Sequence, residues 1–138
     1  MSKILYFAYG SNLNHHQMKN IRCFRSRYLK AHFLKDYKLI FCHPNKLNKF
    51  GYANIIKKKE SKVSGAVWEI TKEHEKILDS YEQFPEIYQK KNFYLGGKKI
   101  MFYIMYKCFI KDPPKTYIDT INKGYEDCNI DLRIKYRF

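Results

Sequence analysis

The sequence predicts an α+β fold, in which many short strands are combined with three short helices. Strand-like runs of apolar and aromatic residues recur along the chain, and the helical segments between them do not alternate with them regularly. Regular alternation would instead indicate a doubly wound parallel sheet. The chain has 138 residues, 45% of them hydrophobic. This length suffices to bury a core, and we expect a single domain over residues 1–138.

The first predicted element is a buried strand that ends in a polar turn. Residues 4–9 are apolar and aromatic without polar alternation, which is typical of a strand buried on both faces. Gly10 permits a positive φ and the close approach of another group. Ser11 or Asn12 is expected to cap a short helix or an irregular crossover over residues 14–23. Such a turn presents several backbone N–H groups that suit an anion or an oxyanion, although an ordinary core strand and turn have the same pattern.

Two predicted strand pairs follow in the first half of the chain. Residues 27–34 and 36–42 carry Tyr, Leu, Phe and Ile in strand-like runs, and we expect a turn at Lys35-Asp36. Residues 52–56 and 62–70 are predicted to form the second pair.

The first predicted helix begins after the second strand pair. Thr71 is its expected N-cap, because a threonine hydroxyl can accept a hydrogen bond from a free N–H of the first turn. The helix must end before Pro85. Its apolar face is predicted to consist of Ile77, Leu78 and Tyr81.

A hairpin and a final helix complete the predicted elements. Residues 87–95 and 99–109 are strand-like, and Gly96-Gly97 between them is a strong signal for a hairpin turn. Pro113-Pro114 opens the last helix. The apolar face of this helix is predicted to consist of Ile118, Ile121 and Tyr125.

The net charge of +14 suggests a polyanionic partner when it is considered alone. The lysines are dispersed, however, and gather only in short clusters such as residues 57–59. This distribution favours solvated faces, so we expect no specific nucleic-acid partner.

The cysteines and histidines do not indicate a metal site. Cys23, Cys42, Cys108 and Cys128 form no Cys-x-x-Cys pair, and the five histidines are scattered. No apolar run approaches the ~20 residues that span a bilayer, and the start of the sequence lacks the features of a secretory signal. We therefore expect a cytoplasmic protein with no membrane association, in which the cysteines are reduced and partly buried.

Glu82 is the residue on which the functional interpretation depends. It follows the first predicted helix and stands between the aromatic residues Tyr81 and Phe84. A carboxyl group in an apolar pocket has a raised pKa, as a general acid or base near neutral pH requires. A glutamate at a helix end is, however, more often a solvated charge, and the pattern alone does not separate the two.

Two segments resemble the motifs of the γ-glutamylcyclotransferase family. Tyr-Phe-Ala-Tyr-Gly-Ser-Asn-Leu at residues 6–13 resembles its signature loop. Leu-Asp-x-x-Glu at residues 78–82, followed by Pro85 and Tyr88, resembles the segment that carries its catalytic glutamate, although Gln83 stands where the family usually has Gly. Weaker matches cover residues 37–41, 52–55, 63–70 and 114–127, and Tyr136.

The resemblance implies a small mixed β-barrel with flanking short helices, and an enzyme without cofactor or metal. In the implied reaction the α-amino group of a γ-glutamyl unit attacks its own side-chain carbonyl, giving 5-oxoproline and a free amine or amino acid. Glu82 would be the general acid and base. The implied substrate-binding residues are Tyr6, Phe7, Ala8, Tyr9, Gly10, Ser11, Asn12, Leu13, Tyr88 and Tyr117.

The leaving group stays open at this point. The signature loop resembles enzymes that act on γ-glutamyl amino acids, whereas the spacing from Glu82 to Tyr88 resembles the γ-glutamylamine branch. A third hypothesis is a non-enzymatic, basic nucleic-acid-binding module. We expect a small-molecule γ-glutamyl substrate as partner, and a monomer or a homodimer.

Overall fold

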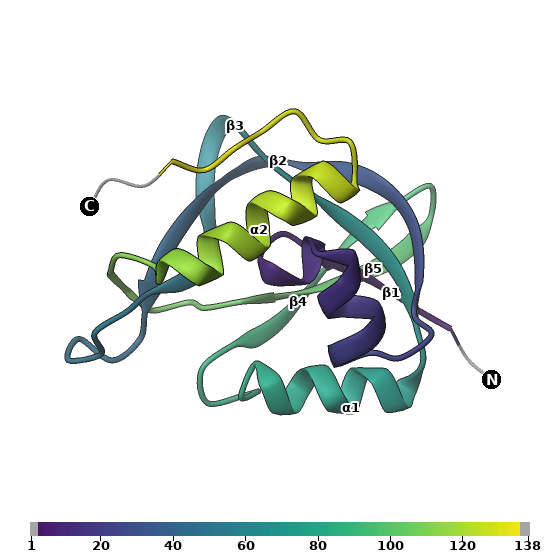
Figure 1. Ribbon diagram of the computed structural model, residues 1–138, viewed down its shortest axis with the longest axis horizontal. Coiled ribbons are helices and arrows are strands. Elements are labelled where there is room, and N and C mark those ends of the chain that lie inside the picture. Colours follow the sequence, from purple (N-terminus) through teal and green to yellow (C-terminus); the bar gives the residue numbers. More distant parts are fainter. Residues whose placement is uncertain (1–2, 136–138) are drawn as a thin grey trace.

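The computed structural model describes residues 3–135 and consists of a six-stranded mixed sheet with few helices (Figure 1). The predicted α+β class is confirmed, and Tyr136 lies outside the described residues. In chain order the elements are β1 (Ile4–Ala8), the 3-10 turn η1 (Ser11–Leu13), the π-helical η2 (Gln17–Arg22), β2 (Arg27–His43), β3 (Tyr52–Ile70), α1 (Lys72–Tyr81), β4 (Gln89–Leu95), β5 (Lys98–Ile104), β6 (Phe109–Ile110) and α2 (Lys115–Asp127).

Strand β1 lies inside the sheet, whose order is β4-β5-β1-β3-β2-β6. It runs antiparallel to β3 and parallel to β5. Successive side chains of a strand point to opposite faces, so Tyr6 and Ala8 enter one hydrophobic core while Phe7 and Tyr9 enter the other. The predicted burial of this strand on both faces is confirmed.

The sheet is curled but open, so the expected barrel describes it only loosely. The sheet curls around one of the two cores. This core is built from residues in or next to β1, β2, β3 and β5. In the described chain the edge strands β4 and β6 pair only with β5 and β2. Because β6 has only two residues, it extends the sheet without closing it. Figure 1 shows α2 across the concave side of the arching β2 and β3, with η1 and η2 between α2 and α1.

The two predicted strand pairs are in fact one long hairpin of β2 and β3. Lys35-Asp36 is not a turn, because β2 continues through it with a register shift between Lys35 and Tyr37. Asp36 has a φ of 63°, Glu60 of β3 has a φ of 69°, and Asp36 Oδ1 accepts a hydrogen bond of 3.0 Å from Glu60 N. A short polar residue with a left-handed backbone conformation is found in β-bulges as well as in turns. Here both strands bend at these residues, but the chain does not reverse its direction.

The first helical region differs from the prediction. Gly10 has a φ of −114°, so it does not use its access to positive φ, and neither Ser11 nor Asn12 caps the following turn. Asn14 takes that role, because its Oδ1 accepts a hydrogen bond of 2.9 Å from Gln17 N.

Helix α1 begins as predicted. Thr71 Oγ1 accepts a hydrogen bond from His74 N at 3.1 Å, and His74 Nδ1 accepts one from Thr71 N at 3.2 Å. The apolar face is confirmed only for Leu78, which is fully buried, whereas Ile77 and Tyr81 are 41% and 50% exposed.

The second half otherwise follows the sequence pattern. Gly96 and Gly97 form the β4–β5 turn with positive φ. The predicted strand 99–109 ends at Ile104, and β6 is a separate strand. The predicted inner face of α2 is buried. A Cβ atom at Gly124 would lie 2.5 Å from Leu13 Cβ, so α2 packs directly on the loop that follows β1.

The expectation of reduced cysteines is wrong for two of the four. Cys42 and Cys108 form a disulfide, whereas Cys23 and Cys128 are free and buried. The pairing of Cys42 with Ile110 brings the loop before β6 beside the end of β2, which places the two sulfur atoms within bonding distance.

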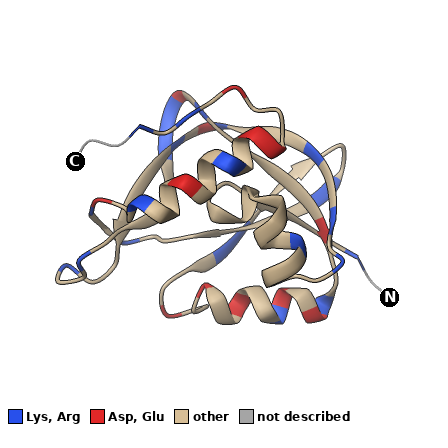
Figure 2. Cartoon of the chain, in the orientation of Figure 1, with Lys and Arg blue, Asp and Glu red and all other residues tan. Residues whose placement is uncertain are grey.

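The charged side chains do not gather on one element. Figure 2 shows Lys and Arg dispersed over most helices and strands. Within residues 3–135 no helix is long and apolar enough to cross a membrane, and no group of three or more His, Cys, Asp or Glu could hold a metal ion.

We predict that the disulfide is required for full stability. It closes a loop of 66 residues, so reduction should lower the free energy of unfolding by about 2–4 kcal/mol in urea titrations. The Cys42→Ser/Cys108→Ser double variant should be insensitive to reductant. A thiol titration of the denatured, unreduced protein should find the two free cysteines, and a count of four would contradict the disulfide.

Candidate active site

A small polar cavity lies where the end of β1 meets the C-terminal end of α1. Its volume is about 40 Å³. It is lined by residues from β1 and the following loop, from β3 and β5, from the turn after α1, and from α2. These residues are Tyr6, Phe7, Tyr9, Gly10, Ser11, Asn12, Ala53, Glu82, Tyr88, Tyr103 and Tyr117.

The loop after β1 presents two backbone donors at this cavity. The N–H groups of Ser11 and Asn12 have no protein acceptor within the described chain, as expected at the start of a helical turn. Leu13 is among the substrate-binding residues that the resemblance implies, but its N–H group is not available to a ligand, because it donates to Gly10 O at 3.0 Å.

The absence of a side chain at Gly10 lets two other residues approach. A Cβ atom there would lie 3.0 Å from Ala53 Cβ and 3.2 Å from the Tyr117 hydroxyl oxygen. Glycine at position 10 is therefore favoured by this close packing, and its φ of −114° does not require it.

The peptide groups of Ala53 anchor two tyrosines of the cavity. Tyr117 Oη accepts a hydrogen bond of 2.9 Å from Ala53 N, and Tyr88 Oη donates one of 2.6 Å to Ala53 O. The Tyr117 hydroxyl proton therefore stays free for another acceptor, whereas the Tyr88 proton is already used.

The same distinction separates Tyr6 from Tyr9. Tyr6 Oη accepts a hydrogen bond of 3.0 Å from Asn12 Nδ2, which leaves its own proton free. Tyr9 Oη donates at 2.6 Å to Tyr103 O. Burial raises the pKa of both Tyr6 and Tyr9, so both hydroxyl groups are neutral at physiological pH. Of the four hydroxyls, those of Tyr6 and Tyr117 can donate to a ligand.

Glu82 is held in the cavity by the end of α1. Its N–H donates at 2.8 Å to Leu78 O, which closes the last turn of the helix. Lys90 of β4 contacts Asp79 at 2.8 Å and Glu75 at 2.7 Å, and the Tyr103 hydroxyl donates at 2.6 Å to Asp79. These contacts fix α1 against β4 and β5, and thereby fix the residue that follows the helix.

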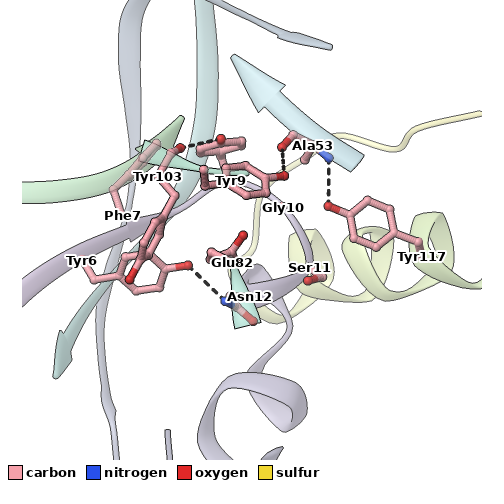
Figure 3. A pocket seen from close by; sticks show the side chains of 11 residues that line it. Tyr6, Phe7, Tyr9, Gly10, Ser11, Asn12, Ala53, Glu82, Tyr103 and Tyr117 are labelled. Atoms are coloured by element: carbon pink, nitrogen blue, oxygen red, sulfur yellow. Dashed lines mark hydrogen bonds between the residues drawn. The ribbon is translucent and has the colours of Figure 1, made fainter. Parts of the chain in front are cut away.

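The Glu82 carboxyl group points into the space between the tyrosines. Figure 3 shows it in the middle of the group, with Tyr6 on one side and Tyr117 on the other. Burial raises the pKa of this carboxyl to about 7, against an opposing effect of the Arg22 guanidinium. A group with this pKa can accept and return a proton near neutral pH.

A larger chamber of about 330 Å³ opens beyond the small cavity. The two share Ser11, Glu82, Tyr88 and Tyr117 as lining residues, so they form an inner and an outer part of one site. The outer chamber is also lined by Gln17, Arg22, His43, Tyr52, Tyr81, Gln83, Ile87, Met105 and Thr120.

The comparison with known proteins identifies the family. A family model described as "Gamma-glutamyl cyclotransferase, AIG2-like" matches residues 6–124, which is most of the chain. The chain belongs to this γ-glutamyl cyclotransferase family.

Solved structures share the fold of this γ-glutamyl cyclotransferase family member. An uncharacterised protein from Homo sapiens is 25% identical, with a TM-score of 0.82 over 96% of this chain and 83% of that protein. A protein named gamma-glutamyl cyclotransferase is 22% identical, with a TM-score of 0.82 over 99% of this chain and 92% of its own. An AIG2-like protein from Mus musculus is 15% identical, with a TM-score of 0.55 over 99% and 98% of the two chains. No curated protein gives a significant sequence match.

The backbone conformation at Gln83 favours glycine, the residue that γ-glutamyl cyclotransferases usually carry after the glutamate. The φ of Gln83 is 51°, in the left-handed region that costs a residue with a side chain about 1–2 kcal/mol. In this chain, glutamine thus holds a conformation that glycine adopts at lower cost.

The structure brings together most of the site residues that the γ-glutamyl cyclotransferase resemblance implied. Ala8 and Leu13 are the exceptions, because their side chains lie in the core and do not line the cavity. Sequence reasoning missed Ala53, Tyr103 and Arg22. Ala53 acts through its backbone, and the other two lie on elements without any motif that singles them out.

We predict that Glu82→Gln stabilises the protein at high pH. The folded state holds the Glu82 proton up to about pH 7, whereas the unfolded state releases it near the ordinary value of 4.5. The contribution of Glu82 to the free energy of unfolding is therefore fully present below pH 4.5. It is lost as the pH rises to 7, which lowers the free energy of unfolding of the wild type by up to about 3 kcal/mol. Urea unfolding at pH 4.5 and pH 8 should show the variant gaining stability relative to wild type only at pH 8. The exposed Glu86→Gln is the matched control, and equal effects of both variants would contradict the burial of Glu82.

Proposed function

We propose that the protein is a γ-glutamyl cyclotransferase that releases 5-oxoproline from a small γ-glutamyl substrate. The observation that carries this proposal is the half-buried Glu82 carboxyl, which faces the loop after β1 across one cavity in a member of this family. In the proposed reaction the substrate α-amino nitrogen forms a bond to the side-chain carbonyl carbon. The amide bond to the leaving nitrogen then breaks.

Glu82 would carry the two protons that the α-amino nitrogen loses as it becomes the lactam N–H. Its carboxylate first takes one proton from the substrate ammonium group and passes it to water, so that the free amine can attack. It then takes a second proton from the tetrahedral intermediate, and the resulting carboxylic acid gives that proton to the departing nitrogen. One group serves both steps because its pKa of about 7 lies near the operating pH. Ring closure within one substrate molecule also needs no second reactant, so orientation in the cavity supplies a large part of the rate.

Four donors are available for the oxyanion and for the substrate carboxylate. These are the backbone N–H groups of Ser11 and Asn12 and the hydroxyl groups of Tyr6 and Tyr117. Donors fixed before the reaction stabilise developing negative charge at little reorganisation cost. The remaining tyrosines shape the cavity through their bonds to the backbone.

Ser11 is assigned as a donor in this mechanism and not as a nucleophile. Its hydroxyl has no hydrogen bond to a histidine, lysine or carboxylate in the described chain. The substrate amine is itself the nucleophile, so a covalent enzyme intermediate is not needed.

We predict that Glu82→Gln abolishes product formation. Purified protein incubated with γ-glutamyl-alanine should release 5-oxoproline, and the variant should be slower by at least about 10²–10⁴-fold, because glutamine cannot carry the proton. Glu86→Gln, which changes an exposed glutamate of the same turn, should keep wild-type activity. Equal activity of wild type and Glu82→Gln would exclude the assigned role.

We also predict that activity depends on the ionisation of Glu82. The carboxylate is the base, so kcat/KM should fall about tenfold per pH unit below a midpoint near pH 7. Initial rates with γ-glutamyl-alanine between pH 5 and pH 8 measure this limb. A midpoint near pH 4.5 would show that Glu82 is not desolvated when it reacts.

A further inference from the structure

We propose that Arg22 binds a carboxylate on the leaving group, so that the enzyme prefers γ-glutamyl amino acids and peptides over γ-glutamylamines. This inference rests on the proposed function and concerns the outer chamber. It names a specificity residue outside both sequence motifs.

The sizes of the two chambers place the leaving group in the outer one. A volume of about 40 Å³ holds only a few water-sized groups, so the inner cavity fits the compact reacting end of a substrate. Glu82 lines both chambers and would protonate the departing nitrogen. The substituent on that nitrogen therefore extends into the outer chamber of about 330 Å³.

Arg22 presents an oriented cation in this chamber. It is the last residue of η2 and is partly buried, with its guanidinium carbon 3.6 Å from the centre of the Tyr81 ring. A guanidinium stacked on a ring keeps its N–H edges free to donate in its own plane, in the geometry that matches a carboxylate. Within residues 3–135 no carboxylate lies within 4.0 Å of Arg22. The cation is thus held in place but not neutralised by an ion pair.

The other polar residues of the outer chamber also favour a negatively charged leaving group. His43 Nδ1 accepts a hydrogen bond of 3.0 Å from Asn45 N, so its neutral ring carries the proton on Nε2 and can donate it. Glu82 is the one acidic residue among those that line the chamber in the described chain, and its negative charge is reduced by protonation near neutral pH. A leaving group with a second ammonium would meet a like charge at Arg22 and find no fixed carboxylate.

The test compares donors whose leaving groups are anionic, neutral or cationic, and the first two of them are nearly the same size. γ-Glutamyl-alanine and γ-glutamyl-alanine amide share one scissile bond, and γ-glutamyl-cadaverine adds a cationic leaving group. Wild type should show a kcat/KM for γ-glutamyl-alanine at least about tenfold above that for the other two. Arg22→Gln should lower this ratio by about tenfold or more, to near unity, mainly through KM for γ-glutamyl-alanine, because a charge-assisted hydrogen bond is lost.

The ratio of donors separates specificity from catalysis. Arg22 also affects the pKa of Glu82, but that effect is common to all three donors and cancels in the ratio. Arg25→Gln removes a nearby exposed charge that does not line the chamber, and it should leave the ratio unchanged. Arg22→Lys keeps the charge without the planar fork, and should give an intermediate ratio if Arg22→Gln folds poorly.

The outcomes distinguish the two proposals. Turnover of all three donors at similar kcat/KM by wild type, or an unchanged ratio in folded Arg22→Gln and Arg22→Lys, would overturn the role of Arg22 and leave the cyclotransferase reaction intact. Absence of 5-oxoproline from every donor would overturn the proposed function itself, and this inference with it.

Discussion

The two hydrogen bonds of Ala53 are the constraint on which the site depends. β1 pairs with β3 only from Ile4–Ile70 to Ala8–Ala66, so the first residues of β3 have an edge that no strand of the described chain covers. Unpaired backbone groups at a buried edge are costly. The hydroxyls of Tyr117 and Tyr88 satisfy them, and in doing so they bring α2 and the segment before β4 to the loop at Gly10. The cavity exists because side chains, rather than a further strand, complete this edge.

The acid in the cavity is maintained against two local costs. Burial of the Glu82 carboxyl disfavours its charged form, and Gln83 holds a left-handed backbone conformation. Asp79 lies three residues before Glu82. Its contacts with Lys90 and Tyr103 hold the end of α1 against the sheet. A fixed helix end imposes the position of the residue that follows it, so the surrounding packing supports an arrangement that the local sequence disfavours.

Local signals in the sequence predicted the elements whose geometry is decided locally. Thr71 as a cap and Gly96-Gly97 as a turn need only their own neighbours. The sequence predicts a turn at Lys35-Asp36, where the structure has a bulge. Asp suits both a turn and a bulge, and only the pairing with the partner strand decides between them. The Cys42–Cys108 bond likewise depends on the pairing of β2 with β6. In the site, the loop after β1 and Glu82 were found through family motifs, whereas Ala53 contributes only backbone atoms that every residue possesses.

The division between the two chambers explains why the motifs pointed to different branches of the family. Both motifs contribute to the inner cavity, where every γ-glutamyl substrate would present the same reacting atoms. Residues there are constrained by the shared chemistry and carry little information about the leaving group. The groups that would meet the leaving group, such as Arg22, His43 and Tyr52, come from η2, the end of β2 and the start of β3, outside both motifs. Under the proposed function, specificity in this chain is therefore to be sought on the wall of the outer chamber, which both motifs leave largely undetermined.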